Sequence, residues 1–150
     1  MELDSDQIRL ILSRDPSLHF YDVLAYDQLP RNVTTPISLV INNENSNEKG
    51  GHWTALVIDE TGVGSYFCSL GTQPYGEIAK LLVKNSTRAY YNKNLIQDPT
   101  NDMCGYHCIY FIVSLMKRKS LGDVVDEYSQ NLVKNDRDVY RWVQSYVKSL

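Results

Sequence analysis

The sequence predicts an α+β fold, in which a small, mostly antiparallel sheet is flanked by helices. Three observations support this prediction. Short apolar runs alternate with segments of helical periodicity, two adjacent apolar runs enclose a Gly-containing turn, and the last third of the chain is helical in pattern. The 150 residues suit one domain spanning positions 1–150, and 43% hydrophobic residues can fill its core.

The first half of the chain contains one helix and most of the predicted strands. Residues 4–16 have an apolar stripe at helical spacing and end at a proline, which indicates a short helix. Residues 36–42 are apolar and β-branched, as in a buried strand. Residues 52–70 read as a hairpin, with its turn at residues 60–64.

The second half is mainly helical. Residues 74–85 predict a helix that has a proline near its start, and residues 88–96 are a third β candidate. An apolar helix is expected to begin at Cys104. Two amphipathic helices, at 121–133 and 136–148, complete the chain.

Composition argues against several functional classes. The formal net charge is −3, and basic residues cluster only in the short run 117–119, so nucleic acid is not the expected partner. The N-terminus is acidic and lacks the apolar region of a signal peptide, and no apolar run is long enough to span a membrane. Three cysteines, an odd number, indicate free thiols in a reducing, intracellular compartment.

The predicted helix start places a thiol in an unusual position. Unpaired N–H groups and the positive end of the helix dipole should surround Cys104 and lower the pKa of its thiol. Asn101 or Asp102 can cap the same turn. Gly105 directly after the thiol leaves space for a substrate. Cys104 is therefore a candidate nucleophile.

A nucleophilic thiol needs a base nearby in space, and His52 is the preferred candidate. It opens a predicted strand, after Gly50 and Gly51, which permit close backbone approach. The indole ring of Trp53 can cover one side of the imidazole and exclude water. His107 ranks lower, because a histidine one helical turn after the thiol cannot easily aim its ring at it.

An amide side chain completes the candidate site. Gln97 precedes Cys104 by seven residues. Its amide, together with the backbone N–H of Cys104, could stabilise the oxyanion of an acyl-transfer intermediate.

In combination, these segments resemble a known family. "GGHW" and "QDPTNDMCGYHC", together with "YDQLP" and "ISLVIN", are similar to segments of the adenain-like cysteine proteases. That family comprises adenovirus-type maturation peptidases and relatives in virophages and DNA transposons, and SUMO-deconjugating proteases share its core. The resemblance implies that Cys104 is the nucleophile, His52 the general base and acid, and Gln97 an oxyanion donor.

One position departs from the family pattern. Where the family has an Asp, Glu or Asn that orients the histidine, this chain has Cys68. Three interpretations remain open. The site works as a Cys–His dyad with Cys68 or Ser69 as a weak orienting group, or another acid such as Asp59 or Asp27 reaches His52, or the site is impaired.

The resemblance implies a cysteine endopeptidase that cleaves viral or mobile-element capsid precursors. Gly51, Trp53 and Gly105 would line its substrate cleft. We expect no cofactor, a monomer, protein substrates and a possible peptide activator, in the virion and the host-cell cytoplasm. A DNA cofactor is not implied, because this chain is acidic.

Three rival functions are considered. The first is a deubiquitinating or SUMO-deconjugating protease, and the second is an impaired binding module of the same fold. The third is a zinc site built from Cys104, His107 and Cys108, with His52 and Cys68 as further ligands. Structural zinc sites usually combine paired knuckles, and the sequence has no second knuckle, so we expect no metal.

Overall fold

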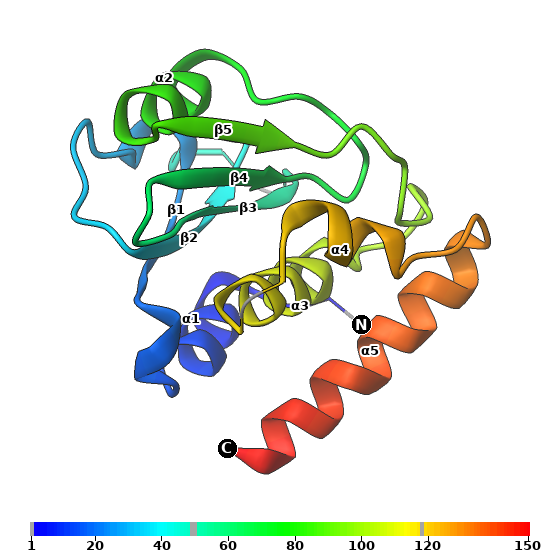
Figure 1. The fold of residues 1–150 in the computed structure, drawn as a ribbon. Helices are drawn as coiled ribbons and strands as arrows, with labels where there is room; N and C mark the ends of the chain where they lie inside the picture. The colour runs from blue at the N-terminus through cyan, green and yellow to red at the C-terminus, as the bar shows by residue number, and fades with distance from the viewer. Residues whose placement is uncertain (1, 49–50, 118) are drawn as a thin grey trace.

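The structure is a computed structural model that describes residues 2–48, 51–117 and 119–150. It confirms the α+β class, with a five-stranded sheet in the order β1-β2-β3-β4-β5 (Figure 1). The strands are β1 (Phe20–Leu24), β2 (Ile37–Asn42), β3 (Trp53–Ile58), β4 (Val63–Phe67) and β5 (Arg88–Tyr91). The helices are α1 (Ser5–Leu12), α2 (Gly76–Asn85), α3 (Cys104–Met116), α4 (Leu121–Asp126) and α5 (Leu132–Ser149), with short 3₁₀ turns η1 (Pro16–Leu18) and η2 (Tyr26–Gln28).

The sheet is mixed, whereas the sequence predicted a mostly antiparallel one. The central pairings β2–β3 and β3–β4 are antiparallel, as the predicted hairpin requires. The outer pairings β1–β2 and β4–β5 are parallel. The parallel pairing of β4 with β5 follows from α2, because a helix between two strands carries the chain back to the same end of the sheet.

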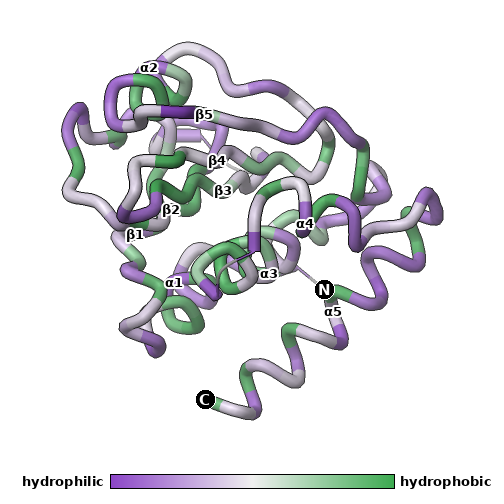
Figure 2. Tube along the Cα trace, in the orientation of Figure 1, coloured by the Kyte–Doolittle hydropathy of each residue, from purple (hydrophilic) through white to green (hydrophobic). Residues whose placement is uncertain are grey.

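The two faces of the sheet pack against different helices. Side chains alternate along a strand, so Val57 of β3 packs toward α3 while Leu56 and Ile58 pack toward α2. Phe67 of β4 stacks on Phe111 of α3, with ring centroids 4.6 Å apart. Figure 2 shows the apolar residues concentrated in the central strands and in α3.

Helix α3 is the central helix of the fold. It is apolar on nearly every side because it lies between the sheet and the helices α1 and α5 (Figure 1). Tyr106 packs on Tyr140 of α5 with centroids 5.1 Å apart, and Val139 and Val143 of α5 join the same core. In the part of the chain that the structure describes, no helix has both the length and the apolar character of a membrane span.

Three predicted boundaries were wrong. The helix expected at 121–133 ends at Asp126. α5 begins at Leu132 rather than at 136, because the Asn131 side chain caps it by accepting from the N–H of Lys134 at 3.1 Å. The strand expected at 88–96 ends at Tyr91.

Candidate active site

The thiol of Cys104 lies at the first residue of α3, as predicted. It is 7% exposed, and its Sγ accepts a hydrogen bond from the backbone N–H of Trp53 at 3.4 Å. The N–H groups of Cys104 and Gly105 also point toward the sulfur. Neither Asn101 nor Asp102 is the N-cap residue. That position belongs to Met103, whose N–H is instead accepted by the Asn101 side chain at 3.1 Å.

The contact between Trp53 and Cys104 places the residue that follows the predicted base against the predicted nucleophile. His52 is the residue directly before Trp53, at the point where β3 begins. Asn43 holds the His52 backbone from both sides: its side-chain oxygen accepts from the His52 N–H at 2.8 Å, and its N–H donates to the His52 carbonyl at 3.2 Å. The start of β3 is therefore fixed against the β2–β3 loop.

Gly51 is required by the path of the chain at this point. Its φ is +89°, a left-handed conformation that favours glycine. A Cβ on Gly51 would lie 2.5 Å from Cγ of Glu44 and 2.8 Å from Oδ1 of Asn43. The backbone thus passes closely over the β2–β3 loop, which is the close approach predicted for this glycine. Gly50, which was assigned the same property, lies outside the described residues.

Burial controls the protonation of both groups. It lowers the pKa of His52 to about 4, with a smaller contribution from the neighbouring imidazole of His107. Burial also raises the pKa of the Cys104 thiol, against the opposing effect of the N–H groups of Trp53, Gly105 and Cys104. The expectation that the helix start lowers this pKa was therefore wrong. Both shifts favour the uncharged forms, a thiol at Cys104 and a neutral imidazole at His52.

One nitrogen of the candidate base lacks a partner. The Nε2 atom of His52 is buried and has no hydrogen-bond partner among the described residues. Neither alternative acid supplies one. Asp59 closes the β3–β4 turn, at the opposite end of β3, by accepting from Thr61 and Val63. Asp27 accepts from the backbone and hydroxyl of Ser46.

Cys68, the residue predicted to replace the orienting acid, directly follows β4. The β3–β4 pairing ends at Ala55 and Phe67, and Cys68 is the residue directly after Phe67. Cys68 is 2% exposed and packs in the apolar cluster under α2. Its backbone N–H and carbonyl both pair with the side-chain amide of Asn92.

Gln97 is held in a chain of side-chain hydrogen bonds. It is 2% exposed, and its Oε1 accepts from the hydroxyl of Ser69 at 2.5 Å. Its Nε2 donates to the carbonyl and to the side-chain oxygen of Asn101, at 3.0 and 3.1 Å. The amide group is therefore directed toward the loop that leads into Cys104, and the Ser69 hydroxyl is bonded to Gln97.

His107 is buried, and its ring is bonded to residues other than Cys104. Both of its ring nitrogens are engaged, Nε2 with Asp136 at 2.7 Å and Nδ1 with the hydroxyl of Tyr128 at 3.2 Å. It therefore has no free nitrogen with which to accept a proton from Cys104. Within the described residues, no group of three or more His, Cys, Asp or Glu side chains is arranged to hold a metal ion.

Gly105 faces the N-terminal segment of the chain. A Cβ at this position would lie 3.3 Å from Cβ of Leu3 and 3.2 Å from Cδ1 of Ile8. The absence of a side chain on Gly105 lets this segment and α1 pack closely against α3. That observation supports a packing role, beside the predicted role in substrate access.

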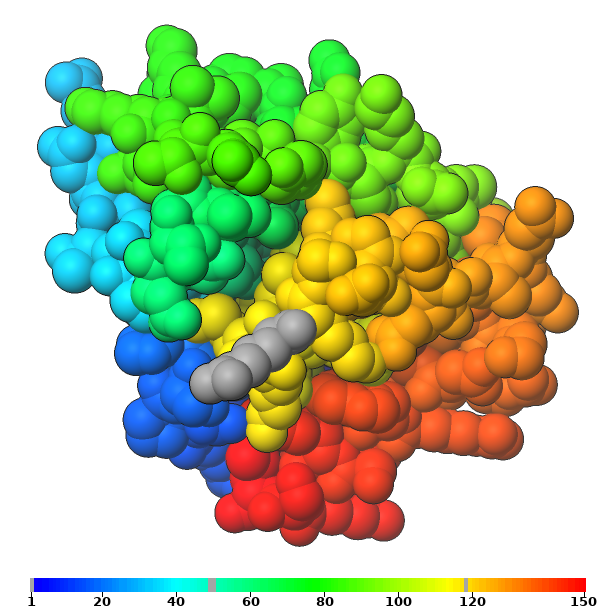
Figure 3. All heavy atoms as spheres, viewed as in Figure 1, coloured from blue at the N-terminus to red at the C-terminus, as the bar shows by residue number. Residues whose placement is uncertain are grey.

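A large groove among the described residues lies away from the thiol. It has a volume of about 1080 Å³ and separates the β4–β5 side of the sheet from α4 and the end of α3, on the face shown in Figure 3. Leu115, Met116, Tyr90 and Val125 are among its lining residues, and no predicted catalytic residue of the described chain is. Since Cys104 and Met116 lie at opposite ends of α3, the groove is roughly 18 Å from the thiol along the helix axis.

Sequence reasoning missed two side chains that organise the site. Asn92 binds the backbone of Cys68, and Asp136 of α5 binds His107 and the loop before α3. An isolated asparagine after a strand gives no such signal. Asp136 falls in an ordinary amphipathic pattern, in which polar residues are expected to face solvent. Its burial, at 5% exposure, becomes visible only in the folded protein.

The fold is similar to that of a viral protease of known structure. Two solved structures of the ASFV pS273R protease are similar to the chain, with TM-scores of 0.57 and 0.52, sequence identities of 18% and 20%, and coverage of 79% and 71% of this chain. In sequence, the chain is 24% identical to "Putative thiol protease R355" of Acanthamoeba polyphaga mimivirus, over 77% of its length. No family model matches the sequence. The chain spans 42% of the mimivirus protein and 59% and 42% of the two ASFV chains.

Proposed function

We propose that this protein is a cysteine endopeptidase in which Cys104 is the nucleophile and His52 the general base. One observation carries the proposal: the Trp53 N–H donates to Sγ of Cys104 at 3.4 Å, which brings the residue after His52 into contact with the thiol at the start of α3. The similarity to viral proteases in fold, and to a thiol protease in sequence, supports the same chemistry.

The reaction begins from the neutral pair. His52 takes the thiol proton as Sγ attacks the carbonyl carbon of the scissile peptide, which forms a tetrahedral oxyanion. The backbone N–H of Cys104 and the amide of Gln97 stabilise this oxyanion. For this step the Gln97 amide shares or exchanges one of its hydrogen bonds to Asn101.

Proton transfer in the opposite direction completes acylation. The His52 imidazolium protonates the leaving amine as the C–N bond breaks, which leaves a thioester on Cys104. His52 then removes a proton from a water molecule that attacks the thioester. Collapse of the second oxyanion releases the carboxylic acid, and the returned proton regenerates the thiol.

The site supports a dyad rather than a triad. The buried Nε2 of His52 has no acceptor among the described residues, and Asp59 and Asp27 are occupied elsewhere. A cysteine protease tolerates this deficit because a thiol is intrinsically a strong nucleophile and needs less help than a serine hydroxyl. Cys68 then serves as a packing residue in the apolar cluster under α2.

We propose capsid precursor proteins of a virus or mobile element, a virophage among them, as the substrates. The similar proteins are a putative thiol protease of a mimivirus and the ASFV pS273R protease, and their viral origin supports this assignment. Trp53 and Gly51, which flank His52, would narrow the cleft before the scissile bond and favour small residues there. Maturation would take place in the virion or in the host-cell cytoplasm.

An impaired binding module is a second candidate, because the unpartnered His52 nitrogen is what loss of an orienting acid would leave. One experiment separates the two functions. The chain is incubated with candidate capsid precursors and, separately, with a peptide that carries a thiol-reactive electrophile, and both reactions are read by mass spectrometry.

If the chain is a protease, we expect defined cleavage products and one adduct on Cys104, and neither should form with Cys104→Ala. Binding of the precursors without cleavage or adduct would support the binding module. Cleavage only of ubiquitin-like precursors would favour the deconjugating protease. Activity of the isolated chain would show that no peptide activator is needed.

A further inference from the structure

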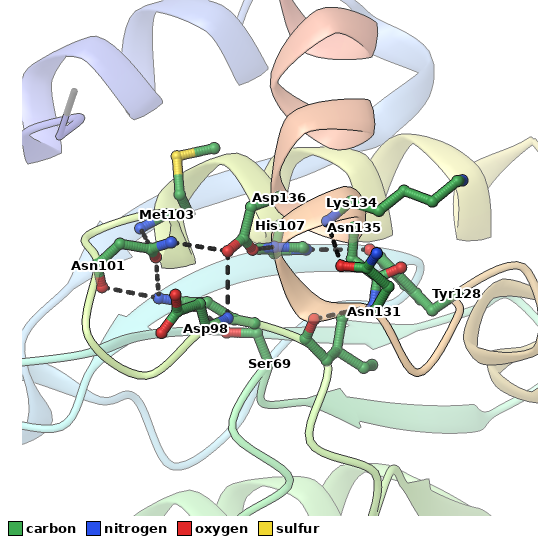
Figure 4. Close-up of polar contacts among 12 residues, drawn as sticks. Ser69, Asp98, Asn101, Met103, His107, Tyr128, Asn131, Lys134, Asn135 and Asp136 are labelled. Carbon is green, nitrogen blue, oxygen red and sulfur yellow. Dashed lines mark hydrogen bonds and ion pairs between the residues drawn. The ribbon is translucent and has the colours of Figure 1, made fainter.

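A buried carboxylate connects the C-terminal helix to the candidate active site. Asp136 lies in the first turns of α5 and is 5% exposed. Its Oδ1 accepts from Nε2 of His107 at 2.7 Å. Its Oδ2 accepts from Nδ2 of Asn101 at 2.7 Å and from the backbone N–H of Asp98 at 3.1 Å (Figure 4).

We propose that Asp136 is a positioning residue for catalysis, which orients the amide of Gln97 through Asn101. The proposal rests on the proposed protease function, but it concerns a residue to which neither the sequence analysis nor the resemblance assigns a role. The direction in which each hydrogen bond runs decides how the two amides are oriented.

Asp136 determines which end of the Asn101 amide donates and which end accepts. A backbone N–H can only donate, so the Oδ2 atom that receives the Asp98 N–H is an acceptor. Asn101 must then present its NH₂ group to Oδ2, and its own oxygen must face the other way. That oxygen receives the Nε2 group of Gln97 and the N–H of Met103, each at 3.1 Å.

The same direction continues through Gln97. With its NH₂ group turned to Asn101, its Oε1 faces Ser69 and accepts from the hydroxyl. A flip of the Asn101 amide would present a donor to Gln97 and to Met103, and both of these groups are donors. The carboxylate of Asp136 therefore selects the orientation of the Asn101 amide, which acts together with the Asn101 carbonyl to orient the amide of Gln97.

Both donors of the proposed oxyanion site depend on the orientation of the Asn101 amide. Gln97 supplies a side-chain donor, and Met103 leads directly into Cys104, whose backbone N–H is the other donor. Figure 4 shows that Asp136 contacts this loop from the side of α5. Because both donors must point at the same oxygen, a loss of orientation at Asn101 should affect the chemical step more than substrate binding.

His107 secures the other side of the carboxylate. It donates from Nε2 to Asp136, and its Nδ1 pairs with the hydroxyl of Tyr128. This arrangement makes a conservative test possible. In Asp136→Asn, the new NH₂ group can face His107, which accommodates it by changing tautomer, while the amide oxygen keeps the contacts to Asn101 and Asp98. Asp136→Leu has a similar volume and no acceptor.

The test compares three variants of the full chain. Asp136→Leu and Asp136→Asn are measured for kcat and KM on a peptide substrate, and for alkylation of Cys104 by iodoacetamide, a reaction that forms no oxyanion. The matched control is Asp138→Leu, since Asp138 lies on the exposed side of the same helix and pairs with Lys134. All measurements are made well below the melting temperature of each variant.

For Asp136→Leu we expect kcat to fall roughly 10- to 100-fold, part of the effect of losing one oxyanion donor, with KM and the alkylation rate within about twofold. Asp136→Asn should stay within about fivefold of the parent kcat, and Asp138→Leu should match the parent. An unchanged kcat in Asp136→Leu would overturn the proposal. So would a fall in kcat and alkylation by the same factor, because a general loss of structure affects both.

A second variant covers the case in which Asp136→Leu does not fold. Asn101→Asp places a carboxylate opposite Asp136 and removes the NH₂ group, at a half-buried loop position. It should lower kcat by a similar factor, and parental activity in this variant would contradict the proposal. If the parent chain itself shows no Cys104-dependent hydrolysis, the proposed function fails, which is a distinct outcome.

Discussion

Replacement of Cys68 by aspartate tests whether His52 lacks an orienting acceptor. Cys68 directly follows β4, His52 directly precedes the neighbouring strand β3, and Nε2 of His52 is buried without a partner among the described residues. A carboxylate at position 68 would accept from this nitrogen. It would also favour the imidazolium, and so raise the pKa of His52 from about 4 toward its usual range.

Two opposing energies determine the outcome. Satisfying a buried nitrogen stabilises the fold by about 1–3 kcal/mol. Placing a carboxylate in the apolar cluster under α2, where Cys68 is 2% exposed, costs several kcal/mol. We therefore expect a net loss of about 2 kcal/mol, or roughly 4–8 °C in melting temperature. kcat/KM should be equal to the parent or up to about tenfold higher.

The assay measures kcat/KM from pH 4 to 8 and the melting temperature for Cys68→Asp, Cys68→Asn and Cys68→Ala. The asparagine variant separates orientation from charge, because it can accept a hydrogen bond without stabilising the imidazolium. Cys68→Ala should lose less than about tenfold in kcat/KM. A hundredfold loss in Cys68→Ala would refute the reasoning, since it would mean that the thiol of Cys68 is itself essential.

Four further predictions follow from the same site. Cys104→Ser should abolish peptide cleavage with little change in melting temperature; cleavage within about tenfold of the parent would exclude Cys104 as the nucleophile. His52→Ala should be as damaging as loss of the thiol, whereas His107→Ala should mainly lower stability, as measured by kcat and thermal unfolding; the reverse order would mean that the base is misassigned. Gln97→Ala should lower kcat by roughly 10- to 1000-fold with little change in KM, as steady-state kinetics can show, and an effect confined to KM would assign Gln97 to substrate binding. Because the pKa of His52 is lowered from 6.5 to about 4, the unfolded chain binds more protons between these pH values, so the free energy of unfolding should fall by up to about 3 kcal/mol as the pH drops through this window; urea denaturation of the parent and of His52→Gln should show this slope only in the parent.

Local sequence patterns were sufficient for the elements that carry the thiol and the histidine. The β-branched run that became β2 matches its prediction, and the start of α3 at Cys104 follows from the apolar pattern after it. The prediction missed β1, because "FYDVL" has only one fully buried side chain and joins the sheet through its parallel pairing with β2. It also merged α4 with the start of α5, because the cap at Asn131 is a single polar residue in an amphipathic stretch.

The electrostatics of the site could not be predicted from local patterns. The helix start suggested a low pKa for Cys104, but burial of the thiol outweighs the N–H groups around it. Burial depends on Trp53 and on the N-terminal segment, which are distant in sequence. The hydrogen bond between Asp136 and Asn101 likewise joins residues that are far apart in the sequence, and no periodicity in the sequence predicts it.

Because Asp136 lies on the last helix, the proposed active site can form fully only after that helix has docked. The loop that carries Gln97 and leads into Cys104 is fastened by a side chain of α5, so it stays unfastened in any chain whose C-terminal helix has not docked. During synthesis the nucleophile leaves the ribosome before this helix does. In a nascent or partly unfolded chain, the Gln97 amide and the Cys104 N–H would then not be oriented as oxyanion donors. Local detachment of α5 from the folded protein would lower its activity in the same way.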